Sequence, residues 1–168
     1  MATTCRQTGR SSIRRTAVMI FVTVGTAHYD PLIIAMDRYV RDGRIDDCVI
    51  AQIGRGRYEP SSFRYFRFIS SLESAYKAAD VIVSTGGAGT TMECVQKGLK
   101  LVVVENTSLM EGHQSQLIGE MARRGHLLWC RDLENLPMQI NEAKETSFEP
   151  FVSDEPTAHL YILQMLKN

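Results

Sequence analysis

Short hydrophobic runs alternate along the chain with segments whose apolar residues recur at helical spacing. The runs are rich in Val, Ile and Leu and are bounded by Gly, Asp and Lys. Continuous apolar runs of this length are typical of strands that are buried on both faces of a parallel sheet. The predicted strands span residues 17–24, 47–54, 64–69, 80–84, 100–105 and 126–130.

Helical patterns fill the intervals between most of these runs. The segment DPLIIAMDRYVRDG begins with Asp30, a predicted N-cap, followed by Pro31 at the first helical position, and it ends at Gly43. The segment SSLESAYKAAD begins with Ser70 and Glu73 in a capping-box pattern. The pattern weakens after Arg131, and further helices are predicted from the glycine run to residue 97, over 113–125 and over 156–168.

The order of these elements predicts the fold class. Strands that alternate with helices indicate an α/β fold of the Rossmann-like type, a parallel sheet with helices on both faces. The length of 168 residues favours a single domain, which we expect over residues 19–168. Residues 1–18 contain Arg but no acidic residue and are predicted to form a disordered extension, with a targeting arm as the alternative.

Composition narrows the function classes. The 19 basic residues balance the 19 acidic ones, whereas a generic nucleic-acid-binding domain would be more basic. No apolar run approaches the roughly 20 residues that a membrane-spanning helix needs. The cysteines have no CxxC spacing, which disfavours a zinc site and a disulfide framework and predicts reduced thiols at Cys5, Cys48, Cys94 and Cys130. We expect no metal and no cofactor.

Three polar or glycine-rich loops should meet at one edge of the predicted sheet. They cover residues 24–30, 84–93 and 105–114, and each follows a predicted strand. In an open parallel sheet, ligands bind beyond the carboxyl ends of the strands, where loops lead into helix N-termini. The sequence therefore predicts a ligand site at this edge.

The glycine run STGGAGTTME is the strongest candidate for ligand binding. It matches neither the GxGxxG nor the Walker pattern, so it does not indicate a dinucleotide or a P-loop. Gly86, Gly87 and Gly89 allow close backbone approach, Thr90 and Thr91 supply hydroxyls, and the following helix N-terminus attracts phosphate. We expect Glu93 in the first helical turn, where its carboxylate can hold a ribose diol. A strand-to-helix turn that needs glycine for its geometry is the alternative.

The other two loops carry further candidates. His28 follows Gly25 and Thr26 and is a candidate general base, although a lone loop histidine is more often a spectator. The third loop contributes Asn106, His113 and Gln114, of which the last two alternatively form an exposed helix start. Arg55 and Arg57 follow the second strand, and the favoured interpretation of this basic pair is a solvated loop.

These motifs together resemble a known family. FVTVGT, GAGT-x-x-E and LM-x-x-HQ occur in this order within residues 19–130. In this combination the chain resembles the cytosolic catalytic subunits of the UDP-N-acetylglucosamine transferase of dolichol-linked oligosaccharide synthesis. It is similar also to subunits of prokaryotic exopolysaccharide glycosyltransferases and to the C-terminal domain of the lipid II-forming N-acetylglucosamine transferase, a GT-B enzyme.

The resemblance implies a site and a reaction. It implies half of a GT-B fold that binds UDP-N-acetylglucosamine and transfers the sugar, with inversion, to a lipid-diphosphate-linked N-acetylglucosamine. Glu93 would contact the ribose, and Asn106, His113 and Gln114 would lie near the sugar or the diphosphate. The diphosphate would lie near Gly25, Thr26, Gly86, Gly87, Ala88, Gly89 and Thr90. His28 is a weaker candidate for the catalytic base, because the base can also come from a partner.

The resemblance also implies a partner. A membrane-anchored, acceptor-binding subunit would recruit the chain to the cytosolic face of the endoplasmic reticulum, or of the plasma membrane in a prokaryote. Residues 156–168 would pack either on this partner or on the chain's own core. Two alternatives stay open: transfer of glucuronate or galactose, with Arg55 or Arg57 facing a carboxylate, and a non-catalytic nucleotide-binding scaffold.

Overall fold

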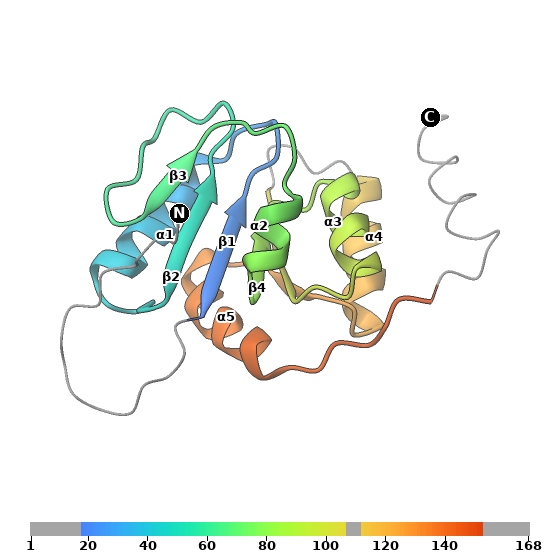
Figure 1. The fold of residues 1–168 in the computed structure, drawn as a ribbon. Helices are drawn as coiled ribbons and strands as arrows, with labels where there is room; N and C mark the ends of the chain where they lie inside the picture. Colours follow the sequence, from blue (N-terminus) through green and yellow to red (C-terminus); the bar gives the residue numbers. More distant parts are fainter. Residues whose placement is uncertain (1–17, 107–111, 153–168) are drawn as a thin grey trace.

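The computed structural model describes residues 18–106 and 112–152 (Figure 1). The predicted extension lies outside the described residues except for Val18, which packs against the core and accepts a hydrogen bond from the backbone of Cys48. The predicted helix over residues 156–168 also lies outside them. Within residues 18–106 and 112–152, no helix is long and apolar enough to cross a bilayer.

All six predicted strands form, and they make one parallel sheet with the order β3-β2-β1-β4-β5-β6. This arrangement confirms the predicted Rossmann-like fold, because consecutive strands run outward from β1 in both directions. The strands are β1 (Met19–Thr23), β2 (Cys48–Gln52), β3 (Arg64–Phe66), β4 (Val81–Ser84), β5 (Leu101–Val104) and β6 (Leu128–Cys130).

Helices cover both faces of the sheet and enclose two hydrophobic cores. In Figure 1, α2 lies on the near side of the strands. One face packs against α1 and α5 through residues such as Val22, Leu32 and Ile140, and the other packs against α2, α3 and α4 through residues such as Phe21 and Ile118. The helices are α1 (Asp30–Arg41), α2 (Glu73–Ala78), α3 (Ala88–Gln96), α4 (Gly112–Arg123) and α5 (Leu136–Glu145).

Two predicted helix caps are wrong. Tyr29 is the N-cap of α1, and the Asp30 carboxylate instead accepts hydrogen bonds from the backbone N–H groups of Arg57 and Tyr58. The N-cap of α2 is Leu72, and its side chain makes no capping bond. The partners of Asp30 lie in the loop after β2, which a local pattern does not contain. At α2, the Glu73 N–H donates to the Ser71 hydroxyl at 3.3 Å and not to the predicted Ser70.

A helix that the sequence pattern does not predict follows Arg131. A short 3₁₀ turn, η1 (Leu133–Asn135), leads into α5. Few apolar residues of α5 face the sheet. Its buried positions are Leu136, Pro137, Ile140 and Ala143. Such a short stripe is difficult to distinguish from an irregular segment by periodicity alone.

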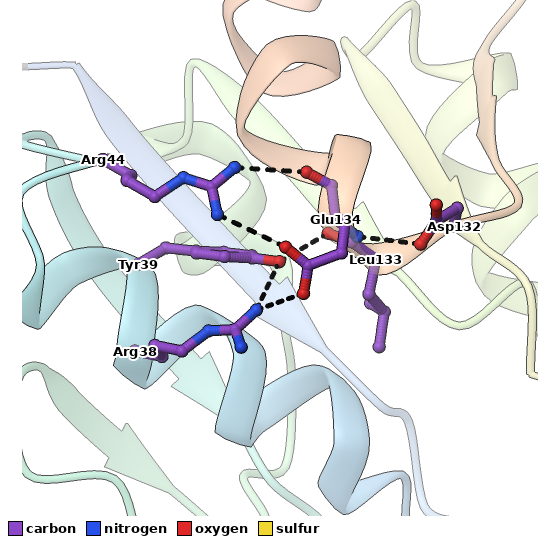
Figure 2. A network of polar contacts seen from close by, with 6 residues as sticks. All are labelled: Arg38, Tyr39, Arg44, Asp132, Leu133 and Glu134. Carbon is purple, nitrogen blue, oxygen red and sulfur yellow. Dashed lines mark hydrogen bonds and ion pairs between the residues drawn. The ribbon is translucent and has the colours of Figure 1, made fainter.

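A polar cluster joins the C-terminal half of α1 to η1 (Figure 2). The hydroxyl of the fully buried Tyr39 donates to the Leu133 carbonyl at 2.8 Å and accepts a hydrogen bond from Arg38 at 3.1 Å. The guanidinium groups of Arg38 and Arg44 lie 5.0 and 4.5 Å from the centre of the Tyr39 ring, and both form ion pairs with Glu134. We call these five residues the Tyr39 clamp.

Candidate functional site

A pocket of about 570 Å³ opens at the carboxyl edge of the sheet. This volume is in the range of roughly 300–1,000 Å³ that is usual for small-molecule sites. The loops after β1 and β4 diverge here, since α1 covers one face and α3 the other, so the pocket occupies the topological switch point of the fold. Its lining comprises Val24, Gly25, Thr26, Ala27, Gln52, Ile69, Ser70, Ser71, Leu72, Thr85, Gly87, Ala88, Gly89, Thr90, Asn106 and Gln114.

The chain turns in the same way after both central strands. Thr23 and Ser84 end β1 and β4 and are partners in the parallel register. The Gly25 N–H donates to the Thr23 hydroxyl at 3.1 Å, and the Gly86 N–H donates to the Ser84 hydroxyl at 3.2 Å. Both glycines have positive φ, 66° and 78°, which explains why glycine follows each strand at this position.

Gly86 has a packing role in addition. A Cβ on this residue would lie 2.7 Å from Ile118 Cδ1 and 2.9 Å from Val103 Cγ1, so any side chain would require these two core side chains to shift. Gly86 is buried and does not itself line the pocket. We conclude that it holds the glycine run against the core while its neighbours face the ligand space.

The N-terminus of α3 faces the pocket without a capping side chain. Gly87 is the N-cap, no side chain accepts a hydrogen bond from the first turn, and the first turn contains no acidic residue. The first N–H groups of a helix have no partner within it, and the helix dipole places partial positive charge there. Space is open around the Cα atoms of Gly87 and Gly89, so an anion can approach the backbone closely.

Glu93 is not where we predicted it. It lies in the second turn of α3, because the helix begins at Ala88, and it does not line the pocket. Its exposed carboxylate accepts a hydrogen bond from Lys97 at 2.9 Å. Lys97 also pairs with Glu73, and these two carboxylates raise the pKa of Lys97 well above its usual value.

The third loop supplies the polar end of the pocket. Asn106 is 1% exposed, and Gln114 in the first turn of α4 is half-buried. The Tyr29 hydroxyl donates to the Glu105 carbonyl at 3.2 Å and so connects the first loop to the third. Burial and the nearby Glu105 charge raise the pKa of Tyr29, which therefore stays a hydrogen-bond donor at neutral pH.

Neither of the two candidate histidines is among the described residues that line the pocket. His28 is exposed and does not line the pocket, although the preceding Ala27 does. His113 is the second residue of α4, and its side chain lies outside the description. The structure thus brings together eight of the predicted residues in one pocket: Gly25, Thr26, Gly87, Ala88, Gly89, Thr90, Asn106 and Gln114.

The loop between β3 and α2 was missed. Ile69, Ser70, Ser71 and Leu72 line the pocket opposite the third loop, because β3 and β5 lie on opposite sides of the β1–β4 pair. Ile69 is 55% exposed, which is unusual for an isoleucine next to a sheet. The sequence pattern predicts a strand and a helix start for these residues, yet their position after a strand is the same signal that identifies the other loops.

Carboxylates of α1 hold the loop between β2 and β3. Asp37 is fully buried and accepts hydrogen bonds from the Tyr58 hydroxyl at 2.7 Å and from the Ser61 and Ser62 N–H groups at 2.9 and 2.7 Å. Burial alone would raise the pKa of Asp37, but these hydrogen bonds lower it below its usual value. This loop is thus fixed on the helix that follows β1.

The remaining chemistry-bearing residues that the structure describes form no metal site. In residues 18–106 and 112–152, no group of His, Cys, Asp and Glu is arranged to hold a metal ion. Cys48, Cys94 and Cys130 form no disulfide with one another, and Cys5 lies outside the described residues. Burial raises the pKa of Cys94 to about 12, so this thiol stays protonated and belongs to the core.

Comparisons of sequence find relatives that are N-acetylglucosamine transferases or subunits of them. The chain is 36% identical over 122 residues to the human UDP-N-acetylglucosamine transferase subunit ALG13, and 36% identical over 128 residues to the mouse subunit. These alignments cover 66% of the chain but only 11% and 10% of the relatives. The UDP-N-acetylglucosamine–N-acetylmuramyl-(pentapeptide) pyrophosphoryl-undecaprenol N-acetylglucosamine transferase from Phocaeicola vulgatus is 29% identical over 49% of the chain and 22% of that relative.

Comparisons of structure support the fold. An NMR structure of ALG13 matches 88% of the chain and 94% of its own length, with a TM-score of 0.56 and 14% identity. MurG from Acinetobacter baumannii matches with a TM-score of 0.62 and 16% identity over 92% of the chain and 55% of its own. The family described as the glycosyltransferase family 28 C-terminal domain matches residues 19–155. The chain therefore belongs to the glycosyltransferase family 28 C-terminal domain family.

Proposed function

We propose that the chain is the donor-binding part of a UDP-sugar glycosyltransferase. The observation that carries this proposal is the pocket at the switch point, bounded by two glycine turns and by the uncapped N-terminus of α3. Family membership supports glycosyl transfer. The human and mouse relatives are subunits of a UDP-N-acetylglucosamine transferase, which supports UDP-N-acetylglucosamine as the donor.

The diphosphate binds between the two glycine turns. Backbone N–H groups of residues 87–90 point toward this space, and Gly25 and Thr26 bound it from β1. Transfer leaves UDP with an additional negative charge, and a fixed helix N-terminus stabilises that charge as it develops. Because this dipole supplies positive charge, the proposed site needs no metal ion at this step, and metal independence stays a prediction.

The two ends of the pocket favour one orientation of the donor. Ile69 and Leu72 make one end apolar, which suits the faces of a uracil ring, while Asn106 and Gln114 provide hydrogen-bonding groups for a sugar at the other. The diphosphate in the middle joins the two parts. Base recognition therefore belongs to the β3–α2 side and sugar recognition to the β5–α4 side, where His113 is the second residue of α4.

Glu93 contacts the ribose from the rim. It follows Thr90 by three residues, so the two side chains lie on the same side of α3, and Thr90 lines the pocket. Contact with the ribose diol requires the carboxylate to rotate away from Lys97. Because this ion pair is exposed, breaking it costs less than about 1 kcal/mol.

Inverting transfer also needs a base that deprotonates the acceptor hydroxyl. His28 is exposed beside the first loop and is the candidate from this chain. A membrane-anchored subunit supplies the lipid-linked N-acetylglucosamine acceptor and completes the catalytic site. We place the assembled enzyme at the cytosolic face of a membrane, the endoplasmic reticulum in a eukaryote.

Calorimetric titration with UDP-N-acetylglucosamine, UDP-glucuronate, UDP-glucose and UDP tests this function. We expect binding that is tightest for UDP-N-acetylglucosamine and that falls at least about tenfold in Glu93→Ala, since two hydrogen bonds to a charged group are lost. Glu142→Ala removes an exposed glutamate of α5 and is the matched control. Tighter binding of UDP-glucuronate would favour the exopolysaccharide alternative. The absence of binding, both alone and with the acceptor subunit, would contradict the proposal.

A further inference from the structure

Three polar side chains form a row across the end of the sheet. Gln52, Thr23 and Ser84 end β2, β1 and β4 and are neighbours in the parallel register. They are 5%, 0% and 2% exposed. Side chains alternate along a strand, so Thr23 points to the same face as Phe21, which packs in the core below α2 and α3. The row therefore lies on that face, beneath the helix N-termini that surround the pocket.

Within this row, Gln52 reaches the pocket. The Thr23 hydroxyl accepts from the Gly25 N–H at 3.1 Å and donates to Gln52 Oε1 at 2.7 Å. Since a backbone N–H only donates, the hydroxyl proton is left for Gln52, and the amide oxygen is the complementary partner. This chain of hydrogen bonds turns Oε1 toward Thr23 and Nε2 away from it.

The amide nitrogen has no partner of its own. Among the residues that the structure describes, Gln52 Nε2 makes no hydrogen bond, and the atom is accessible to solvent although the side chain is 95% buried. Buried amides normally satisfy both ends, with protein or with ordered water. Two oriented N–H donors on an otherwise buried side chain thus face the ligand space.

The position of Gln52 assigns it to one end of the pocket. It lies two strands from Ser84, about 10 Å across the sheet at about 4.8 Å per strand. On its other side it pairs with Phe66, whose strand leads directly to Ile69. Gln52 therefore lies away from the glycine run after β4 and close to the apolar end of the pocket.

We propose that Gln52 recognises the nucleobase of the bound donor by donating a hydrogen bond from Nε2 to the O4 carbonyl oxygen of uracil. This assignment rests on the proposed function, in which the pocket holds a uridine diphosphate. Uracil presents two carbonyl oxygens, whereas cytosine has an amino donor in place of one of them. A fixed amide donor favours the first base over the second, because two donors that face each other leave both unpaired.

NMR titration of the labelled chain with UDP and with CDP tests the assignment directly. The side-chain NH₂ signals of Gln52 are identified by their loss in Gln52→Leu, and we expect them to shift on addition of UDP. Gln52→Leu should weaken UDP binding about tenfold and CDP binding little, so that the preference for UDP falls. Thr23→Val keeps the shape but removes the hydroxyl that orients the amide, and it should reduce the preference by a smaller factor.

Gln139→Leu is the matched control, because Gln139 is a half-buried glutamine of α5 on the opposite face. Gln139→Leu should change neither the affinity for UDP nor the affinity for CDP. If the wild type binds UDP but Gln52→Leu retains both the affinity and the preference, the assignment is wrong and the proposed function stands. If the wild type binds neither nucleotide, alone or with the acceptor subunit, the proposed function fails and the assignment fails with it.

Discussion

The pocket and the Tyr39 clamp are both rich in polar groups, but they use them in opposite ways. In the clamp, the hydroxyl, two guanidinium groups, a carbonyl and a carboxylate are paired with one another (Figure 2). At the pocket, the N-terminus of α3 has no capping side chain, and the amide nitrogen of Gln52 makes no hydrogen bond to any described residue.

This comparison distinguishes polar groups that stabilise the fold from polar groups that can bind a ligand. Paired groups around a buried ring lower the free energy of the folded chain and leave nothing for a ligand. Donors without partners cost stability unless water or a ligand satisfies them. We therefore expect substitutions in the clamp to change the free energy of unfolding, and substitutions in the pocket to change affinity for nucleotides.

The largest effect should come from Tyr39→Ala. Tyr39 is fully buried and is among the largest buried side chains, so its loss should lower the free energy of unfolding by about 3–5 kcal/mol. Urea unfolding followed by circular dichroism measures this change. Tyr65→Ala is the control, because Tyr65 is 36% exposed and should cost much less. Equal losses in the two variants would show that the clamp does not anchor α1.

Asp37→Asn should lower the free energy of unfolding at pH 7 by about 2 kcal/mol, since hydrogen bonds to a charged acceptor are weakened. The folded-state pKa of Asp37 is lowered, so its contribution is present above the unfolded pKa of about 3.9 and is lost as the pH falls through the folded value. The difference in the free energy of unfolding between the wild type and Asp37→Asn should therefore become smaller below pH 4.

Asp42→Asn, an exposed substitution near the end of α1, controls for the loss of one charge and should show no such narrowing. If the free energies of unfolding of the wild type and Asp37→Asn differ by the same amount from pH 7 to pH 3, the charged Asp37 carboxylate does not stabilise the fold as described.

Gly87→Asp should break binding without breaking the fold. Gly87 has a φ of −56° and open space around its Cα, and aspartate is a favourable N-cap, so stability should stay the same or rise slightly. The new charge at the mouth of the anion site should weaken UDP binding at least about tenfold. Calorimetry and thermal unfolding measure the two effects. Gly87→Asn supplies the same shape without the charge, and comparable losses of affinity in both variants would rule out an electrostatic cause.

The smallest effect should come from Glu134→Gln. Its ion pairs with Arg38 and Arg44 involve side chains that are 44–60% exposed, so the loss should be below about 1 kcal/mol. It should shrink further in 1 M salt, where exposed charges are screened. Thermal unfolding at low and high salt checks this. A loss as large as that of Tyr39→Ala would show that the ion pairs, and not the buried ring, dominate the clamp.

Local pattern predicted the fold well where burial is continuous. The runs that became β1, β4 and β5 are almost entirely buried, and their apolar sequences indicate nothing else. The pattern failed where partners are distant in sequence: Asp30 contacts the β2–β3 loop and does not cap its helix. It failed also at α5, whose buried stripe is too short to give a clear period.

Some residues of the candidate site could likewise be predicted from the sequence, and others could not. The glycine turns were predictable, because a positive φ at Gly25 and Gly86 requires glycine and leaves a mark in the sequence. Gln52 and Ile69 were not found, because one looks like an ordinary end of a strand and the other like a core residue. Only the register of the sheet brings them to the pocket. The position of Glu93 was misjudged by one turn, since the start of α3 depends on the conformation of the glycine run.

Mapping UDP binding onto the backbone by NMR tests the central claim most directly. We predict that saturating UDP shifts the amide signals of residues 24–27 and 85–90, while the signals of Tyr39 and Arg44 in the clamp stay unchanged. Shifts confined to the clamp or to another surface, with none in the two glycine turns, would contradict the account.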